Sequence, residues 1–384
     1  MDSQIQKKSW LWVALFALVW FFVSLYSYTQ RDLNLTIFNT PFLQQIQNSL
    51  IELGYYQRPM ATLLFLILSL LLIGLYCKIV LGKLTLNKSQ LLAAIGLLVG
   101  LGLLAYPIFS HDIFNYLFNA KMVLVYGANP HTQTALDFAS DPWVRFMHNV
   151  HTAAPYGYGW TAISLLPVWL GLPRFTISLF LMKAWVAGFY LLEVFLFYKL
   201  SLKLFPKKAL FRTAIMVLNP LLLVETIIVG HNDSVMMAFT LLSLLILYSD
   251  SLPSIKRYPL ALLAWLASVS IKYATVVLLP FYFLKQKIDI FTWGGLALLI
   301  VLLSRPGQLH SWYLHWGIVL LLLSKKWWAV ALALLLSIGG LLRYAPFIYY
   351  GNWDAPVPLQ RYIILGLPLL LLLFKPVQEL FKKL

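Results

Sequence analysis

The sequence is poor in cysteine and in charged residues, and each shortage excludes a class of protein. Charged side chains make up only 11% of its 384 residues, whereas soluble domains carry roughly 25%, so an ordinary cytosolic globular protein is excluded. Cys77 is the only cysteine, which excludes an intrachain disulfide framework and a thiolate metal cluster. No glycine-rich loop follows a strand and opens a helix, so the sequence does not indicate a soluble nucleotide-sugar donor.

Most of what the sequence does contain is hydrophobic: 61% of the residues, with a mean hydropathy of +0.80. Apolar runs such as Leu11–Leu25, Ala61–Tyr76 and Leu91–Tyr106 approach the length that spans a hydrocarbon core of about 30 Å. No small-residue cleavage site follows the first run, so we expect a retained helix rather than a signal peptide. The net charge of +16 comes from short basic clusters between apolar runs, which is typical of the positive-inside rule and not of a nucleic-acid-binding surface. We therefore predict one integral membrane domain over residues 1–384 and no nucleic-acid partner.

The basic clusters predict a topology in the plasma membrane with both termini cytoplasmic. The clusters expected in the cytoplasm are Lys7/Lys8, Lys78/Lys83/Lys88, Lys199/Lys203/Lys207/Lys208/Arg212, Lys256/Arg257, Lys285/Lys287, Lys325/Lys326 and Lys375/Lys382/Lys383. Between them we expect spans at residues 10–28, 59–78, 91–108, 175–199, 211–229, 235–249, 289–304, 312–324, 327–343 and 360–374. Residues 109–160 become a long extracytoplasmic loop after the third span, followed by a partial helix over 161–172.

Residues 258–284 lie between two basic clusters that are both expected in the cytoplasm, so they must cross the membrane an even number of times. They are too few for two full transmembrane helices. We expect a short broken hairpin that turns near Ser270–Lys272, which requires surrounding protein or a wet cavity. The predicted fold is thus an all-α polytopic bundle of about 10–13 transmembrane or partial helices. Although only Lys and Arg were used for the assignment, all seven histidines fall on or near the extracytoplasmic side, together with Asp112, Asp137, Asp141, Asp233 and Asp354. Any chemistry should therefore take place on that face.

Asp112 is the first candidate for chemistry, because it lies in the stretch 110–116 at the external end of the third predicted span. A carboxylate where an apolar helix leaves the membrane is partly desolvated, which moves its pKa toward the working pH. Such a group could serve as the general base for a hydroxyl acceptor. The alternative is that Asp112 caps the amphipathic stretch 113–125.

A second polar cluster, Gly230-His231-Asn232-Asp233-Ser234, sits in a tight turn between two predicted spans. Its side chains could bind sugar hydroxyls or orient the base. Alternatively, the cluster is a turn in which Asp233 or Ser234 caps the next helix. Glu225 lies five residues earlier inside the apolar run, where a carboxyl group is either functional or held by structural hydrogen bonds.

Lys272 in the broken hairpin is the third candidate. An ammonium inside the membrane zone needs an anionic partner, and a lipid phosphate would supply one. The alternative is a lysine whose long side chain reaches the membrane surface.

The fourth candidate is the segment 305–316, which is rich in Trp and Tyr. Such residues normally form an aromatic belt at the membrane interface. Arg305 and His310 add cationic donors that would suit a phosphate leaving group, and Arg343 and Arg361 flank the last external loop with the same possibility. A metal site is not expected, because the i,i+3 pair His148 and His151 has no carboxylate at close range.

Taken in order, these residues resemble the polyprenyl-phosphate-sugar-dependent glycosyltransferases of the GT-C fold. The closest groups are the bacterial polyprenyl-phosphate-mannose mannosyltransferases and, more distantly, the mannosyltransferase of GPI-anchor assembly. The matching stretches are His111-Asp112-Ile113-Phe114-Asn115-Tyr116, Tyr126-Gly127-Ala128-Asn129-Pro130, Tyr156-Gly157-Tyr158-Gly159-Trp160, Asn219-Pro220, Gly230-His231-Asn232-Asp233, Ile271-Lys272-Tyr273 and Trp312-Tyr313-Leu314. The chain departs from the family pattern at Asn129-Pro130-His131 and at Gly157-Tyr158-Gly159-Trp160, so the resemblance implies the fold and leaves the sugar and acceptor open.

The resemblance implies metal-independent transfer of a hexosyl residue, most naturally mannosyl, from a polyprenyl-phosphate donor to a glycan or lipid-glycan acceptor, with no further cofactor. Asp112 maps onto the catalytic base of the family. The residues expected to bind substrate are His111, Asn115, Tyr116, Asn129, His231, Asn232 and Asp233. The residues expected to hold the donor phosphate are Lys272, Arg305, His310 and Tyr313. The alternative function is a transporter or flippase, which also has broken helices near the midplane. A noncatalytic scaffold would not need the clustered external Asp and His.

Overall fold

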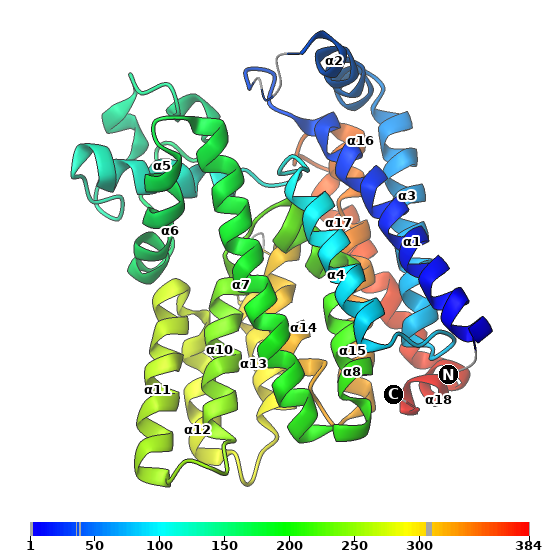
Figure 1. The fold of residues 1–384 in the computed structure, drawn as a ribbon. Coiled ribbons are helices and arrows are strands. Elements are labelled where there is room, and N and C mark those ends of the chain that lie inside the picture. The colour runs from blue at the N-terminus through cyan, green and yellow to red at the C-terminus, as the bar shows by residue number, and fades with distance from the viewer. Residues whose placement is uncertain (1–2, 36, 38–39, 305–308, 384) are drawn as a thin grey trace.

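The computed structural model describes residues 3–35, 37, 40–304 and 309–383. Helices make up the regular structure, and no strand occurs within these residues (Figure 1). Four helical stretches are long and apolar enough to cross a membrane: Gln6–Gln30, Arg58–Val80, Phe175–Leu204 and Trp327–Tyr350. Two bent pairs of helices and four shorter apolar helices accompany them. The prediction of a polytopic helical membrane protein is confirmed.

Helices α1 (Ser3–Tyr26), α3 (Arg58–Val80) and α4 (Lys88–Leu103) pack on one side of the bundle, with the 3₁₀ turn η1 (Ser27–Gln30) after α1. The central helix α7 (Phe175–Leu204) contacts α4, and Lys183 of α7 is buried at this contact. The Lys183 ammonium donates hydrogen bonds to the carbonyls of Gly102, at 3.0 Å, and Ala105. Carbonyls at a helix C-terminus lack intrahelical donors. The buried lysine therefore stabilises the end of α4.

The span expected over 211–229 is broken in the structure. The segment breaks into α8 (Ala209–Val217), α9 (Pro220–Leu223) and the π-helical turn η5 (Val224–Ile228), and the two halves are bent by 54°. Pro220 cannot donate a backbone hydrogen bond. The Asn219 side chain accepts from the amides of Leu221 and Leu222 at 3.1 and 3.3 Å and so starts a new helix. The last predicted span is also irregular, as α17 (Val357–Gly366) runs into the 3₁₀ segment η8 (Leu367–Leu373), and α18 (Lys375–Lys382) follows at 85°.

The predicted break near Ser270–Lys272 is confirmed. Helix α11 (Ser254–Ile271) packs on α10 (Asp233–Leu247) and ends before Lys272, whose backbone is extended. The chain then continues as the 3₁₀ segment η6 (Tyr273–Leu278) and α12 (Leu279–Leu284). The remaining elements are η4 (Pro206–Lys208), α13 (Ile290–Leu303), η7 (Ser311–Tyr313), α14 (Leu314–Leu321), α15 (Trp327–Leu342) and α16 (Ala345–Tyr350).

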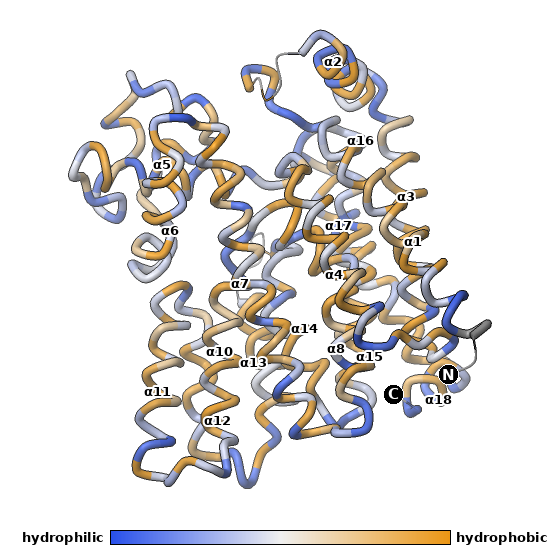
Figure 2. The backbone as a smooth tube through the Cα atoms, in the orientation of Figure 1, coloured by the Kyte–Doolittle hydropathy of each residue, from blue (hydrophilic) through white to orange (hydrophobic). Residues whose placement is uncertain are grey.

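The long loop after α4 contains α5 (Asp112–Tyr126) and the short 3₁₀ turns η2 (Ala135–Phe138) and η3 (Val144–Phe146), and the expected partial helix follows as α6 (Tyr158–Gly171). Helix α2 (Pro41–Tyr56) was not expected from the sequence. Both chain termini lie on the side away from α2 and α5 (Figure 1). Figure 2 shows hydrophobic residues predominating along the central helices, with hydrophilic residues gathered at the turns below α11 and α12 and around α2 and α5.

Candidate active site

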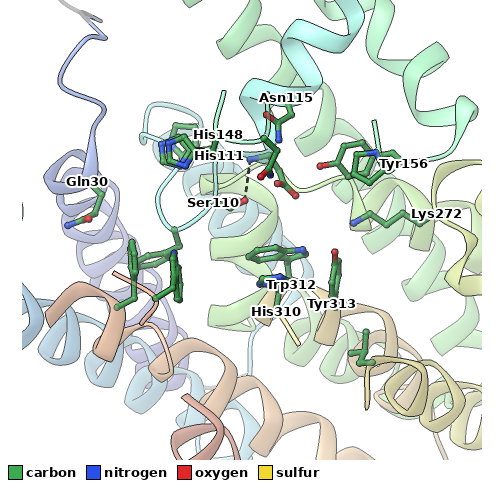
Figure 3. A pocket seen from close by; sticks show the side chains of 18 of the residues that line it. Gln30, Ser110, His111, Asn115, His148, Tyr156, Lys272, His310, Trp312 and Tyr313 are labelled. Carbon is green, nitrogen blue, oxygen red and sulfur yellow. Dashed lines mark hydrogen bonds between the residues drawn. The ribbon is translucent and has the colours of Figure 1, made fainter. Parts of the chain in front are cut away.

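A cavity of about 1100 Å³ opens beside the start of α5 (Figure 3). Its walls come from segments that are far apart in the sequence: the ends of η1 and α2, the beginning of α5, the break after α11, the segment 310–316 and the loop after α16. The polar and aromatic side chains on these walls include Gln30, Tyr55, Arg58, His111, Asp112, Asn115, His148, Tyr156, Lys272, His310, Trp312, Tyr313, Trp316 and Trp353. A pocket of this size and mixed character is typical of an enzyme site for a substrate larger than a simple metabolite.

Asp112 is the first residue of α5 and its side chain is 19% exposed. Its backbone amide donates to the Ser110 hydroxyl at 3.2 Å, while the N-cap position is His111, whose side chain makes no capping bond. The alternative that Asp112 is the helix cap is therefore wrong, and its carboxylate faces the cavity. Ile113 packs under Gly230, whose φ of +83° makes the turn that follows η5. A side chain at Gly230 would collide with Ile113, so this glycine lets the turn approach the start of α5.

The motif Tyr156-Gly157-Tyr158-Gly159 connects the end of the long loop after α4 to the break after α11. The Gly157 amide donates to the Ile271 carbonyl at 2.9 Å, and a Cβ at Gly157 would lie 2.0 Å from the Ser270 carbonyl oxygen. Only glycine allows so close an approach of two backbones. As a result Tyr156 lies beside Lys272, with the Lys272 Nζ 5.9 Å from the ring centre. Burial, and next the charge of Asp112, raise the pKa of the Tyr156 phenol, which stays protonated as a hydrogen-bond donor.

Lys272 is only 9% exposed, so the alternative that it reaches the membrane surface is wrong. Its Nζ pairs with the Asp233 Oδ1 at 2.8 Å, and the same oxygen accepts from the Trp316 indole. The rings of Tyr313 and Trp316 lie 5.1 and 5.8 Å from the ammonium. An ammonium carries three donor hydrogens. The ion pair with Asp233 thus fixes a positive charge at the cavity wall and leaves further donors for a ligand.

The cavity histidines are neutral at pH 7. Burial, and then the neighbouring His148, lower the pKa of His111 to about 3, and the two rings stack at 3.6 Å. Burial, and then the charges of Arg361 and Arg343, lower the pKa of His310 to about 3. The expectation of a cationic His310 is therefore wrong for the unliganded protein. A neutral imidazole still offers one N–H donor and one acceptor nitrogen to a ligand.

The structure brings six of the expected site residues to the cavity wall: His111, Asp112, Asn115, Lys272, His310 and Tyr313. It places Tyr116, His231, Asn232 and Asp233 in a buried layer around that wall, so these four side chains support it instead of lining it. Asn129 lies outside the site, because its side chain is exposed in the turn after α5, where it accepts from the His131 amide at 3.0 Å. Arg305 lies outside the described residues. Arg343 and Arg361 are buried near His310 without lining the cavity.

Sequence reasoning missed several residues that line the cavity. Gln30 comes from η1, Tyr55 from α2 and Arg58 from the start of α3, while Trp353 comes from the loop after α16. The Arg58 guanidinium donates to the Ile348 carbonyl at 3.4 Å, which joins the two segments. No local pattern marks these residues, because they meet only through a contact between segments about three hundred positions apart. Within the described part of the chain, no group of three or more His, Cys, Asp and Glu could hold a metal ion.

Comparison with known proteins agrees with this arrangement. The family model described as alpha-(1->6)-mannopyranosyltransferase, N-terminal domain (MptA_B family) matches residues 39–286, well over half of the chain. The match includes both Asp112 and Lys272. No curated protein and no solved structure matches the chain. The resemblance to polyprenyl-phosphate-mannose mannosyltransferases of the GT-C type is confirmed at the level of the family. The chain belongs to the alpha-(1->6)-mannopyranosyltransferase (MptA_B) family and is a membrane-embedded mannosyltransferase.

Proposed function

We propose that this mannosyltransferase takes its mannosyl residue from a polyprenyl-phosphate carrier and passes it to a hydroxyl of a glycan or lipid-glycan acceptor, on the extracytoplasmic face and without a metal ion. The observation that carries the proposal is that Asp112 and Lys272 open into one cavity. A carboxylate suits proton removal from an alcohol, and a fixed ammonium suits a departing phosphate.

The reaction follows from these two groups. The acceptor oxygen attacks the anomeric carbon while Asp112 takes the hydroxyl proton. The bond from the anomeric carbon to the phosphate oxygen breaks, and polyprenyl phosphate leaves with the electron pair. Lys272, with the N–H of His310 and the phenol of Tyr313 on the same wall, stabilises the charge that develops on the leaving oxygen. In other glycosyl transfers a divalent cation stabilises the charge on the leaving phosphate. Here these fixed donors can do so, which supports transfer without a metal.

A lipid-linked donor is supported by the apolar edge of the cavity. Tyr273, Ala274 and Val277 of η6 line it together with Val301 and Leu302 of α13, and η6 packs on α13. The Tyr273 ring is 62% exposed on this side. A prenyl chain could lie along these residues while its phosphate stays at Lys272, which directly precedes η6. The membrane thus delivers the donor to the site.

The acceptor has the opposite side of the cavity available. In Figure 3, Gln30 lies across the pocket from Tyr156 and Lys272, with His111 and Asn115 between them. Displacement at the anomeric carbon requires the nucleophile to approach opposite the leaving group. The acceptor therefore enters along Gln30, Arg58 and Trp353, whose amide, guanidinium and indole suit a hydroxyl-rich molecule.

The extracytoplasmic placement is supported by the positive-inside rule, which assigns the cytoplasm to the turns that carry the lysine clusters. The cavity lies beside α5, on the side of the molecule away from both termini (Figure 1). Under this orientation the carrier presents its sugar outside the cell.

The decisive experiment compares wild type with Asp112→Asn in detergent, with radiolabelled polyprenyl-phosphate mannose and an oligomannoside acceptor. We expect wild-type enzyme to release the carrier and form product, and Asp112→Asn to lose about 10²–10⁴-fold in turnover while remaining folded, because general base catalysis contributes that much. Asp137→Asn is the matched control, because Asp137 lies in the same loop but does not line the cavity. Its carboxylate accepts a hydrogen bond from the Thr134 amide at 3.0 Å. Unchanged turnover in Asp112→Asn would refute the role of Asp112 as the general base. Solute uptake into proteoliposomes without any glycoside product would refute the proposal that the protein is a transferase.

A further inference from the structure

Glu225 in the π-helical turn η5 is buried, at 1% exposure, and both of its carboxylate oxygens are engaged. Its Oε1 accepts from the Tyr344 hydroxyl at 2.7 Å, and its Oε2 lies 3.1 Å from the His231 Nδ1. A carboxylate that already accepts one hydrogen bond offers a second acceptor to the imidazole. In the tautomer that donates from Nδ1 to Glu225, the His231 Nε2 carries a lone pair.

His231 presents that Nε2 toward the catalytic wall. The nitrogen lies 4.0 Å from the Asp112 Oδ2 and has no hydrogen-bond partner among the described residues. The ring is 1% exposed and stacks on Trp312 at 4.4 Å, so it cannot swing away from this position. The other ionisable side chains near it are Asp233 and His310.

His231 is set apart by its position beside Asp112 more than by its free nitrogen, because the Nδ1 of the buried His315 also has no hydrogen-bond partner among the described residues. Leaving a buried nitrogen without a partner is costly, and folded proteins usually satisfy such groups. Elsewhere in the chain, His315 and Glu193 form a second buried pair, at 2.8 Å, in which the imidazole does not face Asp112 or the cavity. The two pairs differ in that only His231 points at the proposed base.

We propose that Glu225 and His231 form a proton relay behind Asp112; this inference rests on the proposed transferase function. Asp112 first takes the proton of the acceptor hydroxyl. A rotation of its side chain closes the 4.0 Å gap, and the proton passes from the Asp112 carboxyl to the His231 Nε2. Asp112 becomes a carboxylate again, and the imidazolium lies between two carboxylates, Asp112 and Glu225. Because His231 does not line the cavity, the proton returns through Asp112, which does, to water that enters after the product departs. A base oriented by a second buried acid is the general logic of catalytic triads.

A double-mutant cycle tests the relay, with wild type, His231→Gln, Asp112→Asn and the double variant assayed with radiolabelled donor over hours so that residual turnover is measured. We expect His231→Gln to lower kcat by about 10²-fold with little change in the donor KM, since the group acts on the proton and not on binding. In the Asp112→Asn background the same substitution should cost less than about threefold, because residues that act as one unit are not additive. Equal losses in both backgrounds would overturn the relay.

Two further variants separate the relay from stability. Glu225→Gln should lower kcat in parallel with His231→Gln, which keeps the test decisive if His231→Gln folds poorly. His315→Gln breaks the other buried His–Glu pair and is the matched control, with a comparable loss of melting temperature but kcat within about threefold of wild type. A kcat loss in His315→Gln as large as that in His231→Gln would show that both pairs are structural. If wild type itself transfers no mannose, the proposed function fails, whereas additive losses refute only the relay.

Discussion

At the residue scale, Lys272 shows how one buried ion pair can both hold a site together and serve a ligand. Asp233 pairs with the Lys272 ammonium from inside the protein, so this lysine has a carboxylate partner at the cavity wall. The sequence suggested a lipid phosphate as its partner. The structure supplies the Asp233 carboxylate, and the phosphate is a proposed second ligand. Buried ion pairs contribute little net stability, but removing one partner is costly.

We expect Lys272→Met to weaken binding of polyprenyl phosphate by about 2–5 kcal/mol, as when one member of a buried charge pair is removed. Acceptor affinity should stay nearly unchanged. Binding of polyprenyl phosphate to the detergent-solubilised protein, measured beside the melting temperature, separates ligand loss from unfolding.

The control is Lys121→Met. Lys121 pairs with Asp141 at 2.6 Å and lies 4.4 Å from the Trp143 ring centre, so it has a similar carboxylate and aromatic environment outside the cavity. An equal effect of both substitutions on binding of polyprenyl phosphate would show that Lys272 does not bind the phosphate specifically.

At the scale of elements, the site is built where helices are interrupted. The break after α11 presents Lys272, and the turn after η5 presents His231 to the start of α5. Non-helical backbone at membrane depth is tolerated where protein or a wet cavity surrounds it. π-helical turns are also frequent at functional sites. The loop after α16 adds Trp353. Its ring stacks on Phe347 with the ring centres 4.0 Å apart, and the Arg361 guanidinium carbon lies 4.4 Å from the Trp353 ring centre in a cation–π contact.

This loop yields a prediction about the acceptor. Trp353→Ala should weaken acceptor binding by about 0.5–1.5 kcal/mol, the contribution of a well-placed aromatic face, and leave the donor KM unchanged. The measurement is KM for an oligomannoside at saturating donor. Trp169→Ala serves for comparison, because Trp169 is 62% exposed on α6 and does not line the cavity. A change in donor KM instead of acceptor KM would place the acceptor on another wall.

At the scale of the whole molecule, the lysine clusters and the cavity should lie on opposite sides of the membrane. Single cysteines introduced into a Cys77→Ser background test this in intact cells. Cysteines at Ala139 and Ala355, both exposed on the cavity side, should react with an impermeant thiol reagent, whereas one at Ser251, exposed in the turn between α10 and α11, should not. The positive-inside rule is the reason for this expectation. Labelling at Ser251 without permeabilisation, or none at the other two sites, would reverse the orientation.

The sequence by itself determined the features that depend on local composition. Apolar runs and basic clusters predicted a polytopic helical membrane protein, and the shortness of segment 258–284 predicted the break at Lys272, which the structure contains. The ordered motifs predicted the mannosyltransferase family that the family model matches. Hydrophobic period, segment length and charge are properties of consecutive residues, so they can be read without knowing the fold.

Only the tertiary structure decided which distant residues meet. It divided the expected span 211–229 at Pro220, so that Glu225 and His231 stand behind Asp112. It also brought Gln30, Arg58 and Trp353 to the cavity wall, with Gln30 across the pocket from Lys272, and left Asn129 outside the site. The physical reason is that a straight and a broken apolar run have the same hydropathy, while a break is tolerated only where the surrounding protein or a wet cavity satisfies its backbone groups. The choice depends on side-chain contacts across the bundle, such as the bond from Tyr344 to Glu225, which no local pattern encodes.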